Sequence, residues 1–269
     1  MTDKVHQEWK QFGREVRRNR ARTGLSQAEV GKSLQLTGGM IGHIERATRV
    51  PSRDHAEKLD TIFATEGEML KQWLEVIEGR HVLPWFKDAL EMERRARAIC
   101  EYHSILIPGL LQTTDYSRVL IRARLVGASE DEIKELVRVR SERLPKIQPN
   151  RPNLWFVVDE IVITRIVGDE KTMVSQLGHI VALAEEGTIR FQVVPGDVRA
   201  HCGLCSPFRL MTMRDSRKVV RMEHTLGGAT FEKLDAVDEM SALFGALQAE
   251  ALSPTRSISF IRSVMKGMQ

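Results

Sequence analysis

The segment His201-Cys202-Gly203-Leu204-Cys205 carries residue types that bind zinc or exchange thiols. A structural zinc site needs four ligands in a tetrahedral arrangement, and the one remaining cysteine, Cys100, lies about a hundred residues away. This spacing favours a turn between two strands over a metal centre. We therefore expect no metal site and no cofactor.

Two pairs of adjacent polar residues, Asp159-Glu160 and Glu223-His224, are the next candidates for acid–base chemistry. Adjacent residues on a strand point to opposite faces, so neither pair would aim both groups at one substrate atom. Helix capping is the better interpretation of Asp159-Glu160. The sequence has no P-loop, dinucleotide-binding glycine motif, Gly-x-Ser-x-Gly or His-Glu-x-x-His. We predict no catalytic residue and no enzyme, although an active site scattered along the chain would leave no such motif.

Basic residues are concentrated in the first fifth of the 269-residue chain. Residues 1–53 hold 11 Lys and Arg against 5 Asp and Glu, whereas residues 54–80 hold 3 against 7. Such a segment indicates either a nucleic-acid contact surface or a solvated basic helix. The pattern of helices in this segment decides between the two.

The composition is that of a globular protein, with 42% hydrophobic and 28% charged residues and a net charge of +4. The longest apolar stretch, 154–168, is interrupted by Asp159, Glu160 and Arg165, so it does not predict a membrane span. The N-terminus lacks an apolar signal core, and three cysteines cannot form a disulfide framework. We expect a cytoplasmic protein.

Apolar spacing and capping signals predict five short helices in the first eighty residues: 9–22, 27–34, 38–46, one following Ser52, and 66–77. Ser26 and Glu29 form a capping box before the second helix, and Thr37 is the expected N-cap of the third. The short break between these two helices, with the small residue Gly31 where they cross, is typical of a helix-turn-helix. The pattern over residues 1–79 therefore predicts an all-α, five-helix DNA-binding domain.

The exposed leading face of the third helix is expected to consist of three glycines and a histidine: Gly38, Gly39, Gly42 and His43. Glycine offers no side-chain donor to base edges, but it lets backbone N–H groups at a helix N-terminus approach phosphate oxygens. We therefore predict that His43 is the main base-reading side chain and that DNA shape supplies further specificity. Arg46 and Arg49 flank this helix and are expected to contact phosphates.

Three ordered motifs, Leu25-Ser26-Gln27-x-Glu29-Val30-Gly31, Leu34-x-Leu36-Thr37 and Ile41-x-x-Ile44-Glu45-Arg46, resemble the DNA-binding domain of Xre-type, phage-repressor-like regulators over residues 8–77. The resemblance implies that Gln27 places its amide against a phosphate and that Thr37 caps the recognition helix beside the groove. It also implies a buried, structural ion pair between Arg20 and Glu45. Gln35 and Ala47 depart from the family pattern, which usually has glycine at both positions.

Residues 80–84 read as a short hinge, and the remainder, 85–269, predicts a mixed α/β (α+β) domain. Helices are expected at about 85–100, 113–125, 129–144, 169–186 and 232–252. Strand-like runs lie at 102–107, 154–158, 189–194, 208–213 and 219–223.

Motifs of this second domain resemble the C-terminal module of WhiJ-like, antitoxin-like actinobacterial regulators: Ile107-Pro108-Gly109-Leu110-Leu111-Gln112-Thr113 with Tyr116, Arg138-x-Arg140, Asp159-Glu160, Gln176-Leu177, Gln192-Val193-Val194-Pro195 and Ala251-Leu252-Ser253. The resemblance implies a transcription factor whose sensing module works with a small partner protein or a small-molecule effector.

One small recognition helix covers too few base pairs for specificity. We therefore expect a homodimer, joined mainly by its C-terminal domains, on a palindromic operator in double-stranded DNA. Two alternatives stay open: an antitoxin-like protein that neutralises a small partner protein, and an enzyme fused to a DNA-binding module.

Overall fold

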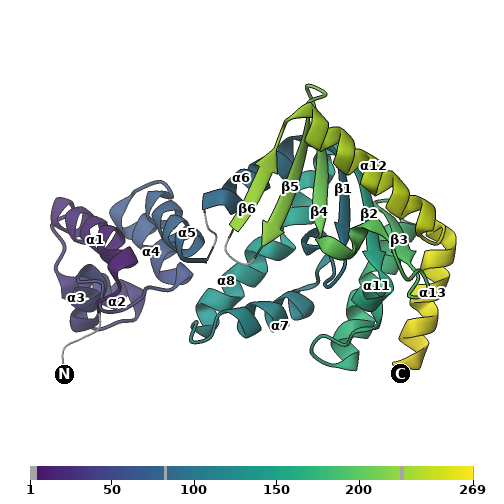
Figure 1. The fold of residues 1–269 in the computed structure, drawn as a ribbon. Coiled ribbons are helices and arrows are strands. Elements are labelled where there is room, and N and C mark those ends of the chain that lie inside the picture. Colours follow the sequence, from purple (N-terminus) through teal and green to yellow (C-terminus); the bar gives the residue numbers. More distant parts are fainter. Residues whose placement is uncertain (1–4, 82–83, 225–226, 269) are drawn as a thin grey trace. The chain divides into compact units, whose positions relative to one another are not determined.

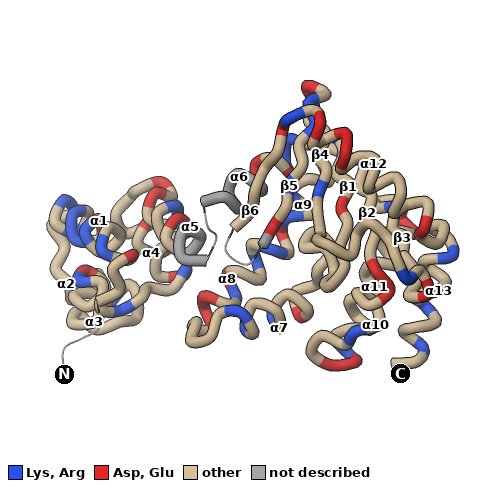
Figure 2. Tube along the Cα trace, in the orientation of Figure 1, with Lys and Arg blue, Asp and Glu red and all other residues tan. Residues whose placement is uncertain are grey.

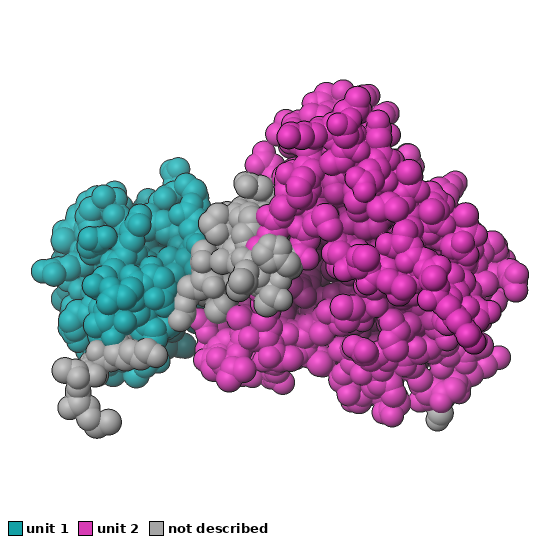
Figure 3. All heavy atoms as spheres, in the orientation of Figure 1, with its two compact units in different colours: residues 1–84 teal, residues 85–269 magenta. Residues whose placement is uncertain are grey.

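The computed structural model describes residues 5–81, 84–224 and 227–268 (Figure 1). The chain divides into two compact units, residues 1–84 and 85–269 (Figure 3). The predicted hinge at 80–84 includes residues 82–83, which lie outside the described residues.

The N-terminal unit is helical, and its elements are η1 (Gln7–Trp9, a 3-10 turn), α1 (Lys10–Arg22), α2 (Gln27–Leu34), α3 (Gly38–Glu45), α4 (Arg53–Phe63) and α5 (Glu68–His81). Apolar residues three or four positions apart place one face of each helix in a shared core. Trp9 and Trp73 are each 1% exposed, with ring centroids 6.3 Å apart. The five predicted helices are confirmed, with small shifts at their ends.

The C-terminal unit is built on a six-stranded mixed sheet in the order β3-β2-β1-β4-β5-β6. Its strands are β1 (Ala96–His103), β2 (Asn153–Asp159), β3 (Arg190–Val194), β4 (Phe208–Met213), β5 (Lys218–His224) and β6 (Gly227–Phe231). The first three strands are parallel, and β4 to β6 form an antiparallel meander joined to β1.

Helices cover both faces of this sheet (Figure 1). The helices and 3-10 turns of the unit are α6 (Pro84–Arg95), η2 (Gly109–Leu111), α7 (Thr114–Arg124), α8 (Glu130–Ser141), α9 (Arg143–Ile147), η3 (Gln148–Asn150), α10 (Glu160–Thr164), α11 (Glu170–Glu185), η4 (Cys202–Cys205), α12 (Leu234–Glu250) and α13 (Pro254–Gly267). The larger core, around Ile99 and Phe156, lies against α11 and α13, whereas α12 packs over Tyr102 and Phe208 on the opposite face.

The predicted helix at 85–100 is wrong at its C-terminal end. The helix stops at Arg95, and the chain continues directly into β1, the strand that pairs with both β2 and β4. Local apolar spacing does not separate a helix from a buried central strand, because the strand is fixed by partners 50 or more residues away. The short edge strand β6 and the last helix, α13, were also absent from the sequence prediction. The mixed α+β class itself is confirmed.

Candidate nucleic-acid interface

The turn between α2 and α3 is held by the local signals that the sequence predicted. The capping box of Ser26 and Glu29 is present at the start of α2, and the Thr37 hydroxyl accepts the Met40 N–H at the start of α3. A Cβ at Gly31 would lie 2.7 Å from the Leu36 carbonyl oxygen. Only glycine fits where the chain folds back so closely, so Gly31 sets the crossing of the two helices.

A three-residue hydrogen-bonded network fixes α3 against α1 and α2. Arg20 Nε lies 2.5 Å from Glu45 Oε1, and Gln27 Nε2 donates to Glu45 Oε2 at 2.8 Å. The side chains of Arg20 and Glu45 are 18% and 5% exposed, so the pair is mostly shielded from water. The Glu45 carboxylate raises the pKa of the Arg20 guanidinium above its ordinary value. The predicted ion pair between Arg20 and Glu45 is therefore present.

Gln27 has a second role that the sequence did not predict. One amide hydrogen is committed to Glu45, and the amide lies over Gly42, where a Cβ would be 3.2 Å from Gln27 Oε1. The amide group has a second N–H, so the phosphate contact that the family resemblance implies stays a prediction.

The sequence predicts that all three glycines of α3 lie on its exposed face, and the structure confirms this only for Gly39. Gly39 is exposed, with no neighbour nearer to its Cβ position than the Thr37 hydroxyl at 3.9 Å. Gly38 faces the Ala28 backbone, where a Cβ would be 3.1 Å from a backbone nitrogen, and Gly42 is buried. Placing Gly42 on the exposed face was therefore wrong, because the Gln27 and Arg46 side chains fold over it.

His43 is partly buried and is oriented by its own loop. Its Nδ1 lies 2.8 Å from the Thr48 hydroxyl oxygen, and the Thr48 N–H donates to the His43 carbonyl at 2.9 Å. Thr48 has no sequence signal for this role, because the contact forms only when the chain turns after α3. The imidazole is thus a positioned group, and its predicted reading of a base stays a prediction.

Exposed cations flank α3. Arg46 and Arg49 are exposed, and within the described residues neither side chain makes a hydrogen bond or an ion pair. Arg14 and Arg17 on α1, which are not among the predicted site residues, are exposed as well. Figure 2 shows the concentration of Lys and Arg along α1. These side chains have the charge and the reach to contact phosphates.

The second unit places the other sequence candidates in structural roles. Asp159 ends β2 and is the N-cap residue of α10, as the capping interpretation predicts, but its carboxylate makes no capping bond. The carboxylate instead accepts the Tyr102 hydroxyl at 2.7 Å. His201 Nε2 lies 3.3 Å from Asp159 Oδ1, and His201 Nδ1 accepts the Gly203 N–H at 3.3 Å. Both ring nitrogens are therefore engaged in holding the η4 turn. Burial and the bond to Asp159 raise the pKa of Tyr102 above its ordinary value.

The two cysteines of η4 are both exposed. Across the described ranges, no group of three or more His, Cys, Asp or Glu side chains has an arrangement that would hold a metal ion. The second pair of adjacent polar residues, Glu223-His224, lies at the end of β5, where Glu223 Oε1 lies 3.3 Å from Arg221 Nε. The side chain of His224 lies outside the described part of the chain.

The crossed helices and the exposed cations around α3 define a helix-turn-helix DNA-binding domain, and residues 11–73 match the helix-turn-helix domain family. Residues 86–263 match a second family, the domain of unknown function DUF5753. Because this match covers more than half of the chain, the protein belongs to the DUF5753 family. Neither the curated proteins nor the solved structures contain a match to the chain. No helix in the described ranges is long and apolar enough to span a membrane.

Proposed function

We propose that this protein is a sequence-specific transcription regulator of the Xre type that binds a palindromic operator as a homodimer. The observation that carries the proposal is the surface of α3. An open glycine, Gly39, lies near the N-cap. At the other end lie two exposed arginines, Arg46 and Arg49, whose side chains make no hydrogen bond or ion pair with the described residues. This arrangement suits close contact of the helix N-terminus and the flanking cations with the DNA backbone.

The C-terminal unit is proposed to sense a small molecule or a small partner protein and to supply the dimer contact. Its motifs resemble those of WhiJ-like, antitoxin-like regulators, and the basic N-terminal surface must stay open for DNA. We assign no catalytic step to this unit. In support, both nitrogens of His201 are taken by Asp159 and Gly203, so this histidine has no ring nitrogen left to activate a neighbouring cysteine.

Selection of binding sites from random double-stranded DNA tests the proposal, combined with sedimentation of the full-length protein. We expect a two-fold symmetric site whose half-sites are about 34–36 Å apart, bound by two chains. A single asymmetric half-site bound by one chain would rule out the dimeric reading. Failure to enrich any sequence, together with a small protein co-purifying from the native source, would favour the antitoxin-like alternative.

A further inference from the structure

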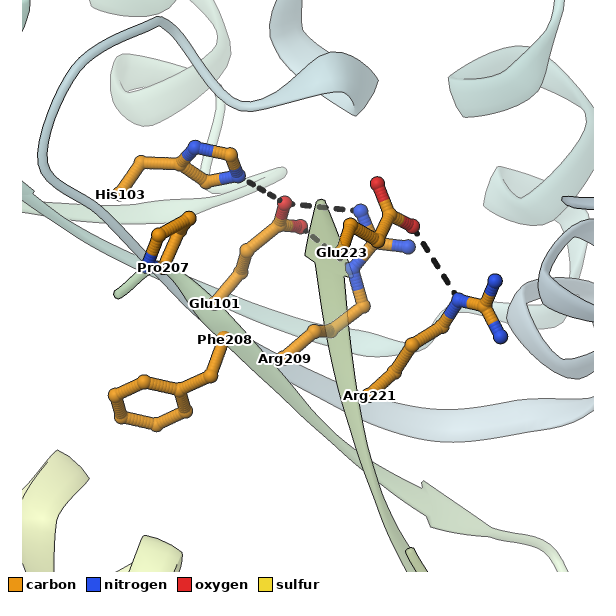
Figure 4. A pocket seen from close by; sticks show the side chains of 7 residues that line it. All are labelled: Glu101, His103, Pro207, Phe208, Arg209, Arg221 and Glu223. Atoms are coloured by element: carbon orange, nitrogen blue, oxygen red, sulfur yellow. Dashed lines mark hydrogen bonds and ion pairs between the residues drawn. The ribbon is translucent and has the colours of Figure 1, made fainter. Parts of the chain in front are cut away.

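A network of charged side chains lies between the sheet and the helices on one of its faces. Its buried members are Glu93, Glu101, Arg143, Arg209 and Arg221, whereas Arg140 is partly exposed and Glu223 is exposed. Arg209 donates to both oxygens of Glu101 at 2.9 Å and also contacts Glu93. Although burial opposes ionisation, Arg209 and His103 hold the pKa of Glu101 well below its ordinary value. Part of this network opens into a small pocket lined by Glu101, His103, Arg209, Arg221 and Glu223 (Figure 4).

Three of the four arginines have a carboxylate in contact. Arg143 Nε donates to Glu93 Oε2 at 3.2 Å. The Arg143 guanidinium fits there because residue 109 is glycine: a Cβ at that position would lie 2.9 Å from Arg143 Nη1. Arg209 pairs with Glu93 and Glu101, and Arg221 pairs with Glu223 at 3.3 Å. The fold therefore compensates each of these cations with an anion.

Arg140 is the exception. Its guanidinium makes one hydrogen bond, from Nη1 to the Gln112 amide oxygen at 2.9 Å, and no carboxylate of the described residues lies within 4 Å. Gln112 is held in place because its own amide N–H donates to the Ile107 carbonyl at 2.7 Å. Burial and the neighbouring Arg143 lower the pKa of Arg140 to about 10, against a smaller opposing effect of Glu223. The fold thus places the Arg140 guanidinium where its charged form is disfavoured, and its one hydrogen-bond partner, Gln112, is neutral.

The balance of charge points to one kind of occupant. Of the four arginines in this network, Arg140 is the one that has no carboxylate of the described residues within 4 Å. A guanidinium with unused N–H donors matches the two oxygens of a carboxylate in a parallel, bidentate geometry. A dianion such as phosphate would be repelled more strongly than a monoanion by Glu223, which acts on Arg140 electrostatically.

We propose that Arg140 anchors a binding site for a small carboxylate-bearing molecule, with Gln112 fixing the orientation of its guanidinium. Arg140 is partly exposed and Glu223 is 40% exposed, so the site is open to a ligand from solvent. The proposal deepens the effector part of the proposed function by naming a ligand class. It rests on the C-terminal unit alone and does not depend on DNA binding.

Thermal unfolding of the full-length protein without DNA tests this site. Acetate is titrated against chloride at constant ionic strength in a cationic amine buffer, with inorganic phosphate as a third anion. We expect acetate to raise the Tm of the wild type in a saturable manner, beyond chloride and phosphate. Arg140→Gln should weaken the apparent acetate affinity by about tenfold or more, the usual effect of losing a charged hydrogen bond.

The same variant separates a ligand anchor from a structural arginine. In chloride, Arg140→Gln should raise the Tm, because it removes a partly buried charge that has no carboxylate partner and keeps a polar group that can still bond Gln112. The matched control is Lys134→Gln, an exposed position on the same helix, where Lys134 Nζ lies 3.9 Å from Asp131 Oδ1. This variant should respond to acetate as the wild type does.

Several results would overturn the proposal. The first is that acetate does not raise the Tm of the wild type, and the second is that acetate raises the Tm of Arg140→Gln as much as that of the wild type. The third is that Arg140→Gln has a lower Tm than the wild type in chloride, or fails to fold. A larger shift with phosphate than with acetate would overturn the assignment to carboxylates. Because DNA is absent throughout, a failure of the proposed regulator function would leave these outcomes unchanged.

Discussion

Arg20 of α1 holds both carboxylate oxygens of Glu45 in α3, with Nε 2.5 Å from Oε1 and Nη2 3.3 Å from Oε2. The same guanidinium donates to the Leu25 carbonyl at 3.0 Å, just before α2 begins. One side chain therefore ties together the ends of three helices, and the orientation of α3 depends on it.

Replacing Arg20 by glutamine should lower the free energy of unfolding of the N-terminal unit by about 1–3 kcal/mol, less than for a fully buried pair because Arg20 retains some exposure. Glu45 would be left 5% exposed without its cation. Calorimetry of the full-length protein measures the change. The control is Arg18→Gln, an exposed partner of Glu15, which should change stability by less than about 0.5 kcal/mol. Equal effects of the two variants would show that Arg20 has no special structural role.

Gln35 ends α2 in the left-handed region, with φ of 58°, and its side chain is exposed. Because a Cβ is unfavourable there, Gln35→Gly should stabilise the protein by about 0.5–1 kcal/mol despite the greater flexibility of glycine in the unfolded chain. Urea unfolding measures the difference. Lys32→Gly, an exposed helical position in α2, should instead destabilise by about 1 kcal/mol. A destabilised Gln35→Gly variant would contradict the argument.

His43→Ala should reduce discrimination by about 1–3 kcal/mol at one base pair of each half-site, because the imidazole is the polar side chain positioned on the recognition helix. The measurement compares binding to a panel of single-base operator variants. Thr48→Ala is the matched control: it removes the hydroxyl 2.8 Å from Nδ1 and leaves the imidazole, so its loss should be smaller. Base preferences in His43→Ala that parallel the wild type everywhere would remove this residue from base reading.

Arg49→Gln and Arg46→Gln should each flatten the dependence of log K on log salt by about 0.9, the contribution of one phosphate contact. Binding should weaken on all sequences alike, since phosphate contacts carry no base information. Titrations at several salt concentrations give the slope. Arg122→Gln, an exposed arginine of α7 paired with Glu130, should leave the slope as it is. An unchanged slope in either α3-flanking variant would place that arginine outside the interface.

Partial burial in α11 lowers the pKa of His179 below its ordinary value of 6.5, against a smaller opposing effect of Glu186. The unfolded chain therefore binds the proton more readily than the folded chain. The contribution of His179 to stability is full above pH 6.5 and is lost as the pH falls toward the folded-state pKa. Unfolding free energies measured from pH 7.5 down to about 5 should fall less steeply in His179→Gln than in the wild type. If the free energies of unfolding of the two proteins fall in parallel with pH, His179 does not contribute to the pH dependence of stability.

The sequence by itself determined the local elements of the first unit. The Ser26–Glu29 capping box and the Thr37 cap connect residues three positions apart, so their spacing can be read directly from the chain. The pairing of Arg20 with Glu45 was implied by a family pattern and is present in the structure. In this unit, short-range hydrogen bonding and apolar spacing carry most of the information.

Only the tertiary structure decided where β1 begins, which α3 glycines are buried, and what surrounds Arg140. Ala96–His103 becomes a strand because β2 and β4 supply its hydrogen-bond partners. Gly42 is covered by Gln27, from another helix, and Arg140 meets Gln112, 28 residues earlier in the chain. Burial, charge compensation and strand pairing are set by residues that meet only after folding, so residue type and spacing along the chain do not encode them locally.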